Sequence, residues 1–170
     1  MPFAVKALDH IVLTCKNVNA TVAFYTKRLG MQHEVFRSSK DPPGIERYDN
    51  TQNPISSHQS VDKPPFSHSL LLTPPAFSRH ALLFGQQKLN LHQAGSEFEP
   101  KASLAKPGTA DLCFLTSTPI TDVLAELKKE GLEVLEDGKV VDRTGARGKL
   151  KSVYTRDPDG NLIEISNYVD

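Results

Sequence analysis

The chain has 170 residues, of which 38% are hydrophobic, and its 20 basic and 20 acidic side chains give a formal net charge of zero. This length and composition fit one packed domain or two half-size modules, and zero net charge disfavours nucleic acid or an anionic membrane as the main partner. No segment approaches the roughly 20 apolar residues of a membrane span, and the first residues lack a signal-peptide apolar region. We therefore expect a soluble cytoplasmic protein. The two cysteines lack CxxC spacing and are expected to be free and buried.

The first half of the chain predicts one helix among four strands. Apolar runs, helical spacing and turn residues predict a strand at 8–15, a helix at about 19–28, a strand at 31–37, and a hairpin of 79–84 with 88–92. The segment 38–78 between them is rich in proline, which is excluded from central strands. We interpret this segment as an inserted arm.

The second half of the chain repeats the first. The expected elements are a strand at 109–116, a helix ending at Gly131, a strand at 132–135, and a hairpin of 151–156 with 161–165. The first strand and helix align at a shift of 101 positions and the hairpins at a shift of 72. The sequence therefore predicts an α+β fold of two modules, each strand–helix–strand–strand–strand, at 8–95 and 109–170.

Four polar side chains occupy equivalent places in this repeat. Strand alternation puts them on the sheet face away from the helix. His10 aligns with Asp111 at the shift of 101, and His92 aligns with Glu164 at the shift of 72. Two imidazoles and two carboxylates without thiolate suit a Zn, Ni, Co, Mn or Fe(II) ion with open coordination positions. The remaining histidines lack such partners and are interpreted as surface or loop residues: His33, His58, His68 and His80.

Several motifs resemble a known family. The segments LDHIVLT (8–14), TVAFYTKRLGM (21–31) and RDPDGNLIEI (156–165) resemble the vicinal oxygen chelate superfamily. That group includes glyoxalase I, fosfomycin-resistance proteins, extradiol dioxygenases and bleomycin-resistance proteins. The segments LLFGQQKLNLHQ (82–93), FEPKA (98–102) and DRTGA (142–146) look closest to its glyoxalase domain-containing protein 5 type.

The resemblance implies two βαβββ modules whose sheets form a half-barrel around one divalent ion, often completed across a homodimer. Family ligands lie on the first and last strands of each module, at the positions of His10, His92, Asp111 and Glu164. Many relatives have histidine where this chain has Asp111, so the other three are the safer ligands. Without Asp111 the set becomes the two-histidine, one-carboxylate pattern of iron(II) oxygenases.

The first functional hypothesis is a metal-dependent lyase or isomerase of the glyoxalase type. It would bind adjacent oxygens of a small substrate and stabilise an enediolate-type anion, with Glu164 as the general base. Asn90, Arg143 and Arg147 are the expected substrate contacts.

Two alternatives remain open at the level of sequence. One is an iron-dependent extradiol dioxygenase, although such enzymes usually have longer chains with four modules. The other is a binding protein of the bleomycin-resistance type, which sequesters a ligand without turnover.

Overall fold

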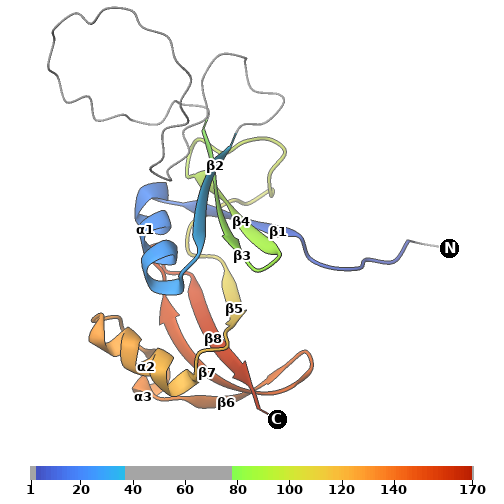
Figure 1. Cartoon of the computed structure of the whole chain (residues 1–170). Coiled ribbons are helices and arrows are strands. Elements are labelled where there is room, and N and C mark those ends of the chain that lie inside the picture. Colours follow the sequence, from blue (N-terminus) through green and yellow to red (C-terminus); the bar gives the residue numbers. More distant parts are fainter. Residues whose placement is uncertain (1–2, 37–77, 170) are drawn as a thin grey trace, which may run out of the picture.

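The chain folds into two four-stranded sheets of the same topology. We describe it from a computed structural model over residues 3–36 and 78–169. The first sheet has the order β1-β4-β3-β2, in which β1 and β4 are parallel and the other pairs antiparallel (Figure 1). Its elements are β1 (His10–Cys15), α1 (Val18–Leu29), β2 (Gln32–Phe36), β3 (Arg79–Phe84) and β4 (Gln87–Gln93). The expected arm at 38–78 lies outside the described residues except for Ser78.

The second sheet repeats this arrangement with the order β5-β8-β7-β6. Its elements are β5 (Asp111–Leu115), α2 (Ile120–Lys129), α3 (Leu135–Gly138), β6 (Val141–Gly145), β7 (Gly148–Arg156) and β8 (Leu162–Tyr168). The two sheets confirm the expected α+β fold.

One predicted strand is wrong. Residues 132–135 do not pair with the sheet; Leu132 and Val134 instead pack against the core, and the short α3 follows. The second strand of this module is β6, which pairs with β7 from Val141↔Ser152 to Gly145↔Gly148. A two-residue connection makes this hairpin a local pairing with little loop-closure entropy to overcome. The apolar pattern of 132–135 reports burial, not strand pairing.

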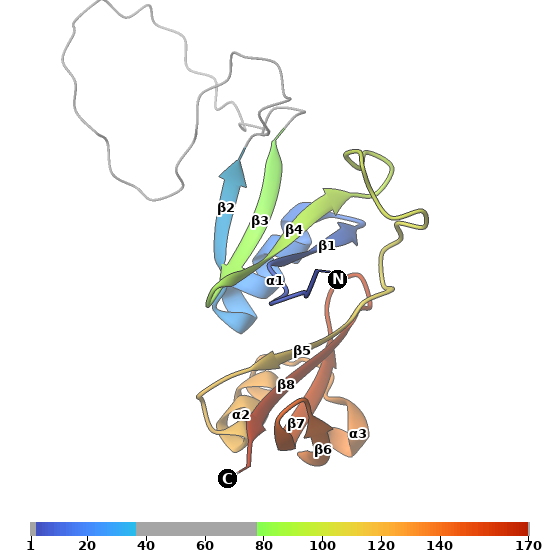
Figure 2. The ribbon, with the colours of Figure 1, turned by 90° about the vertical axis from the view of Figure 1, so that its right-hand side faces the viewer.

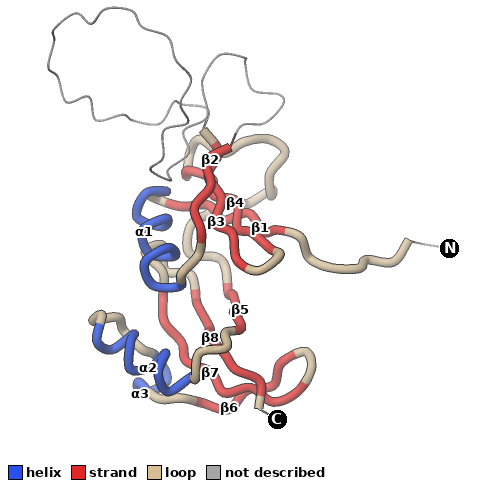
Figure 3. The backbone as a smooth tube through the Cα atoms, in the orientation of Figure 1, coloured by secondary structure: helices blue, strands red, loops and turns tan. Residues whose placement is uncertain are grey.

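Both main helices cover the same side of the molecule. α1 begins at Asn17, whose side chain accepts a hydrogen bond from the backbone N–H of Ala20 at 3.1 Å, and it ends at Gly30 in the left-handed region at φ 66°. Figure 2 shows α1 and α2 behind the two sheets, and Figure 3 shows both helices to the left of the strands, so that neither helix covers the opposite sheet faces. Within the two described ranges, no helix is long and apolar enough to cross a membrane.

The core lies between the helices and the covered sheet faces. Alternate residues of each strand point into this core. In β4, for example, Leu89 and Leu91 are buried on the helix side, whereas Asn90 and His92 point to the other face. The buried apolar side chains come from both modules: Leu13, Cys15, Phe24, Tyr25, Met31, Leu82, Leu89, Leu91, Ile120, Leu127, Val153, Ile163 and Ile165.

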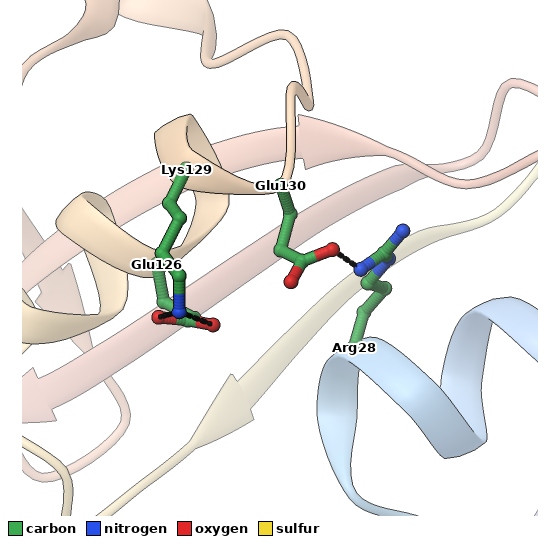
Figure 4. A network of polar contacts seen from close by, with 4 residues as sticks. All are labelled: Arg28, Glu126, Lys129 and Glu130. Atoms are coloured by element: carbon green, nitrogen blue, oxygen red, sulfur yellow. Dashed lines mark hydrogen bonds and ion pairs between the residues drawn. The ribbon is translucent and has the colours of Figure 1, made fainter.

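The turn between β7 and β8 joins the second module to the first. Asp157 and Asp159 in this turn are buried. The Tyr25 hydroxyl of α1 donates to Asp157 Oδ2 at 3.0 Å, and the Lys16 backbone N–H donates to Asp159 Oδ1 at 2.8 Å. On the surface an ion pair between Arg28 of α1 and Glu130, directly after α2, adds a second link (Figure 4).

Candidate functional site

The open face of the first sheet carries both histidines expected as ligands, but at separate places. In the parallel pair of β1 and β4, His10 lies opposite Lys88, and Thr14 lies opposite His92. His10 is 44% exposed, and its Nδ1 lies 2.7 Å from Asp9 Oδ1. The fully paired stretch from His10 to Thr14 therefore separates the two imidazoles by four strand positions.

The open face of the second sheet carries the two expected carboxylates closer together. In the parallel pair of β5 and β8, Asp111 lies opposite Leu162, and Cys113 lies opposite Glu164. Asp111 and Glu164 are thus two positions apart along the strands. In the first sheet, the pair with the same offset is His10 and Asn90, because Asn90 lies opposite Val12.

The strand register corrects the alignment of the two hairpins. When His10 is taken as the equivalent of Asp111, β4 aligns with β8 at a shift of 74 positions. Asn90 is then the equivalent of Glu164, and His92 is the equivalent of Ser166. The sequence alignment gave a shift of 72 because it matched the two hairpins at their turns, and these turns differ in length. Residues 85–86 connect β3 to β4, whereas residues 157–161 connect β7 to β8.

Distance along the strands limits which of these side chains can share one ion. At about 3.3 Å per residue, His10 and His92 start roughly 13 Å apart on one sheet face, whereas His10 and Asn90 start roughly half as far apart along the strand direction. A ligating imidazole nitrogen lies about 2 Å from its ion. Among residues 3–36 and 78–169 of one chain, no group of three or more His, Cys, Asp or Glu side chains is close enough to hold a metal.

Glu164 lies beside two serine hydroxyl groups of the second sheet. Its Oε1 accepts hydrogen bonds from Ser152 Oγ at 2.6 Å and from Ser166 Oγ at 3.1 Å. The two serines are completely buried and lie 2.8 Å from each other. Cys113 Sγ lies 3.5 Å from Ser166 Oγ, and although the Cys113 residue is exposed, burial of the thiol raises its pKa. Alternation along β8 places Ser166 on the face of Glu164, whereas Ser152 joins them through the pairing of β7 with β8.

The two arginines expected to bind substrate have different surroundings. Arg143 Nε donates to the Tyr154 hydroxyl at 3.0 Å, and its guanidinium pairs with Glu136 at 3.2 Å. Tyr154 lies directly opposite Glu164 in the β7–β8 pair, and burial raises the pKa of its hydroxyl. Arg147 instead lies over the Tyr168 ring, 4.6 Å from its centroid. Of these two arginines, only Arg143 thus contacts a neighbour of Glu164, namely Tyr154.

Comparison with known proteins identifies the family. Residues 7–165 match the family described as Glyoxalase/Bleomycin resistance protein/Dioxygenase superfamily. The chain belongs to this superfamily. That result confirms the resemblance to the superfamily. The closer assignment to the glyoxalase domain-containing protein 5 type stays a prediction.

Relatives of this superfamily match nearly the whole chain. The virulence protein STM3117 of Salmonella typhimurium is 41% identical over 162 residues, which cover 95% of this chain and 84% of the relative. Its crystal structure has a TM-score of 0.70 at 40% identity, covering 98% of this chain and all of that one. The glyoxalase domain-containing protein RDO1 of Mycosarcoma maydis is 39% identical over 167 residues, which cover 98% of this chain and 71% of the relative.

A more distant enzyme of the superfamily shares the fold. The lactoylglutathione lyase of Agrobacterium tumefaciens has a TM-score of 0.55 at 18% identity, with 96% of this chain and 94% of that one covered. At this identity the likeness concerns the fold alone.

His92 lies in a separate cluster at the end of β4. Its ring packs edge-on against Phe98 at a centroid distance of 5.4 Å, and the Arg79 guanidinium lies 4.0 Å from the centroid of the same Phe98 ring. Burial, followed by the positive charge of Arg79, lowers the pKa of His92, while Glu97 acts in the opposite direction. His92 is therefore held neutral near pH 7 in the folded chain.

Two further histidines form a pair that the sequence interpretation missed. His33 Nε2 lies 2.9 Å from His80 Nδ1, and the rings are nearly parallel at 5°. Because His33 lies opposite Leu82, the pair occupies the helix-covered face and is half-buried, not at the surface. Alternation from the buried Leu82 would have placed His80 on this face, whereas His33 lies on β2 and is placed there by the strand pairing. His58 and His68 lie outside the described residues.

The histidine pair predicts a loss of stability in acid. Burial lowers the pKa of His33 and of His80, and His33 lowers that of His80 further. Each folded-state pKa is below the unfolded value of about 6.5, so the unfolded chain binds more protons as the pH falls through that value. The free energy of unfolding, measured in urea, should therefore fall from pH 7.5 to 5.5 more steeply than in a His33→Gln/His80→Gln variant. Equal slopes would contradict the prediction.

Proposed function

We propose that the chain is a divalent-metal-dependent enzyme of the glyoxalase type, a lyase or isomerase, whose site is shared by two copies. His10 and Asn90 of one copy and Asp111 and Glu164 of the other would surround the ion. The observation that carries this proposal is the equivalent spacing of the two pairs in the strand register. Zn, Ni, Co, Mn and Fe(II) all suit imidazole and carboxylate ligands.

The chemistry of the donors fits such an ion. The contact of His10 Nδ1 with Asp9 leaves Nε2 as the ligating nitrogen, an arrangement common for metal-binding histidines. The Oδ1 atom of Asn90 is buried without a hydrogen-bond partner in the described part of the chain. Hydroxyl donors from Ser152 and Ser166 orient the Glu164 carboxylate. Coordination to a metal ion would satisfy the unpaired amide oxygen of Asn90.

Exposure of both open faces supports a partner copy. The side chains of Val12 and Leu115 are 45% and 52% exposed on β1 and β5, the edge strands of the two sheets. Both open faces lie on the same side of the chain (Figure 2). A second copy covering them would bury apolar surface and bring His10 toward the carboxylates of its partner.

Glu164 is the proposed general base. When bound, a divalent ion supplies a Lewis acid for two adjacent oxygens of a small substrate. Glu164 would accept a proton from the carbon beside the substrate carbonyl. Tyr154, opposite Glu164 and bonded to Arg143, would orient the substrate, and Arg143 would balance its negative charge. Arg147, over Tyr168, would contact substrate only at the rim of the sheet.

A mixing experiment tests the shared site. His10→Ala and Glu164→Ala variants should each bind no ion, because every site in either homodimer lacks one ligand. Random exchange of subunits gives about half mixed dimers with one intact site each, and thus about one quarter of the wild-type metal content. Elemental analysis after unfolding and refolding the mixture measures it. No recovery in a mixture shown to contain mixed dimers would contradict the shared site.

A further inference from the structure

A cavity of about 530 Å³ lies beside β1, the end of β4 and the linker from β4 to β5. Figure 2 shows this linker running past the end of β1 toward β5. Two lysines and a largely apolar wall line the cavity, and none of the lining residues within 3–36 and 78–169 is acidic. Six lining residues matter most here: Val12, His92, Pro100, Lys101, Leu104 and Lys106. This volume falls within the usual range for small-molecule sites.

His92, which lines the cavity, has a buried polar atom without a hydrogen-bond partner among residues 3–36 and 78–169. The His92 residue is only 9% exposed, and its Nδ1 makes no hydrogen bond within the described ranges. An unsatisfied buried polar atom is costly and uncommon in folded proteins. A ligand oxygen inside the cavity would supply the missing hydrogen bond.

The charges around the cavity favour an anion. Lys106 has no ion pair among the residues that the structure describes, whereas Lys101 is paired with Glu99. Lysines attract an anion as point charges, without the flat two-pronged geometry of arginine.

The wall of the cavity favours an apolar body on that anion. Leu104 of the linker is 67% exposed, so a hydrocarbon group lying against it would remove apolar surface from water. Val12 is two positions along β1 from His10, on the same open face. A ligand held at Lys106 and His92 would therefore extend toward the proposed metal site.

We propose that this cavity binds the carboxylate of a small organic acid whose apolar body lies along β1. The assignment of this acid as the substrate class rests on the proposed function, whereas the binding itself does not. A phosphate ester suits the site less well, because in the part of the chain that the structure describes no arginine and no helix N-terminus lines the cavity.

Hexanoate is a suitable probe, with 1-hexanol as the uncharged match. Titrations of the full chain, treated with EDTA and followed by amide and imidazole NMR shifts, should show hexanoate binding with shifts at His92 and Lys106. The affinity for 1-hexanol should be at least about tenfold lower than that for hexanoate, because the alcohol cannot make a charge-assisted interaction. Lys106→Gln should weaken hexanoate binding by about the same factor. Lys129→Gln, which removes a lysine on α2 away from the cavity, should leave it unchanged.

Several results would overturn this proposal. They are equal affinity for hexanoate and 1-hexanol, equal binding by the Lys106→Gln and Lys129→Gln variants, and an absence of hexanoate binding. Metal content, measured on the same protein before EDTA treatment, separates the two claims. Hexanoate binding by a chain that takes up no metal would refute the proposed enzyme but retain the cavity. Metal uptake without hexanoate binding would retain the proposed metal site but refute the proposed cavity ligand.

Discussion

Replacing Glu164 with glutamine should lower the affinity for a divalent ion by roughly 100-fold or more. The amide carries no charge, and it would present a nitrogen or a weaker oxygen to the ion. Loss of a group that merely hydrogen-bonds to a ligand already costs about 10- to 100-fold in affinity. Competition between the protein and a chromophoric zinc chelator measures this change.

Two further variants make the Glu164 result specific. Ser152→Ala removes the 2.6 Å hydrogen bond to Glu164 Oε1 and should weaken binding by about tenfold. Glu126→Gln removes an exposed carboxylate of α2 that pairs with Lys129, and it should leave zinc affinity unchanged. Equal zinc affinities for the Glu164→Gln and Glu126→Gln variants would rule out Glu164 as a ligand.

Replacing Asp157 with alanine should lower the free energy of unfolding by about 3–5 kcal/mol, because several buried donors lose their acceptor at once. The buried carboxylate accepts hydrogen bonds from the Tyr25 hydroxyl at 3.0 Å, from the backbone N–H groups of Asp159 and Asn161 at 2.9 Å each, and from Asn161 Nδ2 at 2.7 Å. Alanine removes all of these acceptors at the contact between the modules. Urea unfolding followed by circular dichroism measures the loss.

Smaller changes calibrate the Asp157 result. Tyr25→Phe removes one of these hydrogen bonds and should cost about 1–2 kcal/mol. Asp142→Ala breaks an exposed ion pair with Lys151 and should leave the free energy of unfolding almost unchanged, because solvent screens such pairs. If Asp157→Ala were no more destabilising than Asp142→Ala, the buried turn would not be what stabilises the contact between modules.

The strand faces and the repeat could be predicted from the sequence because they depend on local alternation. The spacing of Leu89 and Leu91 indicates which side of β4 faces the helix, and both are buried. The position of β6 could not be predicted, since 132–135 is as apolar as a strand and only its packing distinguishes it. Burial and strand pairing leave the same pattern in a short apolar run.

The register between strands was the harder part of the site. Aligning the hairpins by their turns associates His92 with Glu164, whereas the pairing of β1 with β4 makes Asn90 the equivalent residue. A shift of two residues preserves the face of every side chain, so alternation cannot detect it. The same error hides the separate cluster of His92 with Phe98 and Arg79, because those contacts join residues distant in sequence.

Metal content is the most direct test of the proposed site. Elemental analysis of the purified chain should find about one divalent ion per site, as for other metal enzymes of three or four protein ligands. His10→Ala and Glu164→Ala should each lose this ion, while His92→Ala should retain it because His92 lies four positions along the strand pair from His10. Unchanged metal content in the His10→Ala and Glu164→Ala variants would contradict the account.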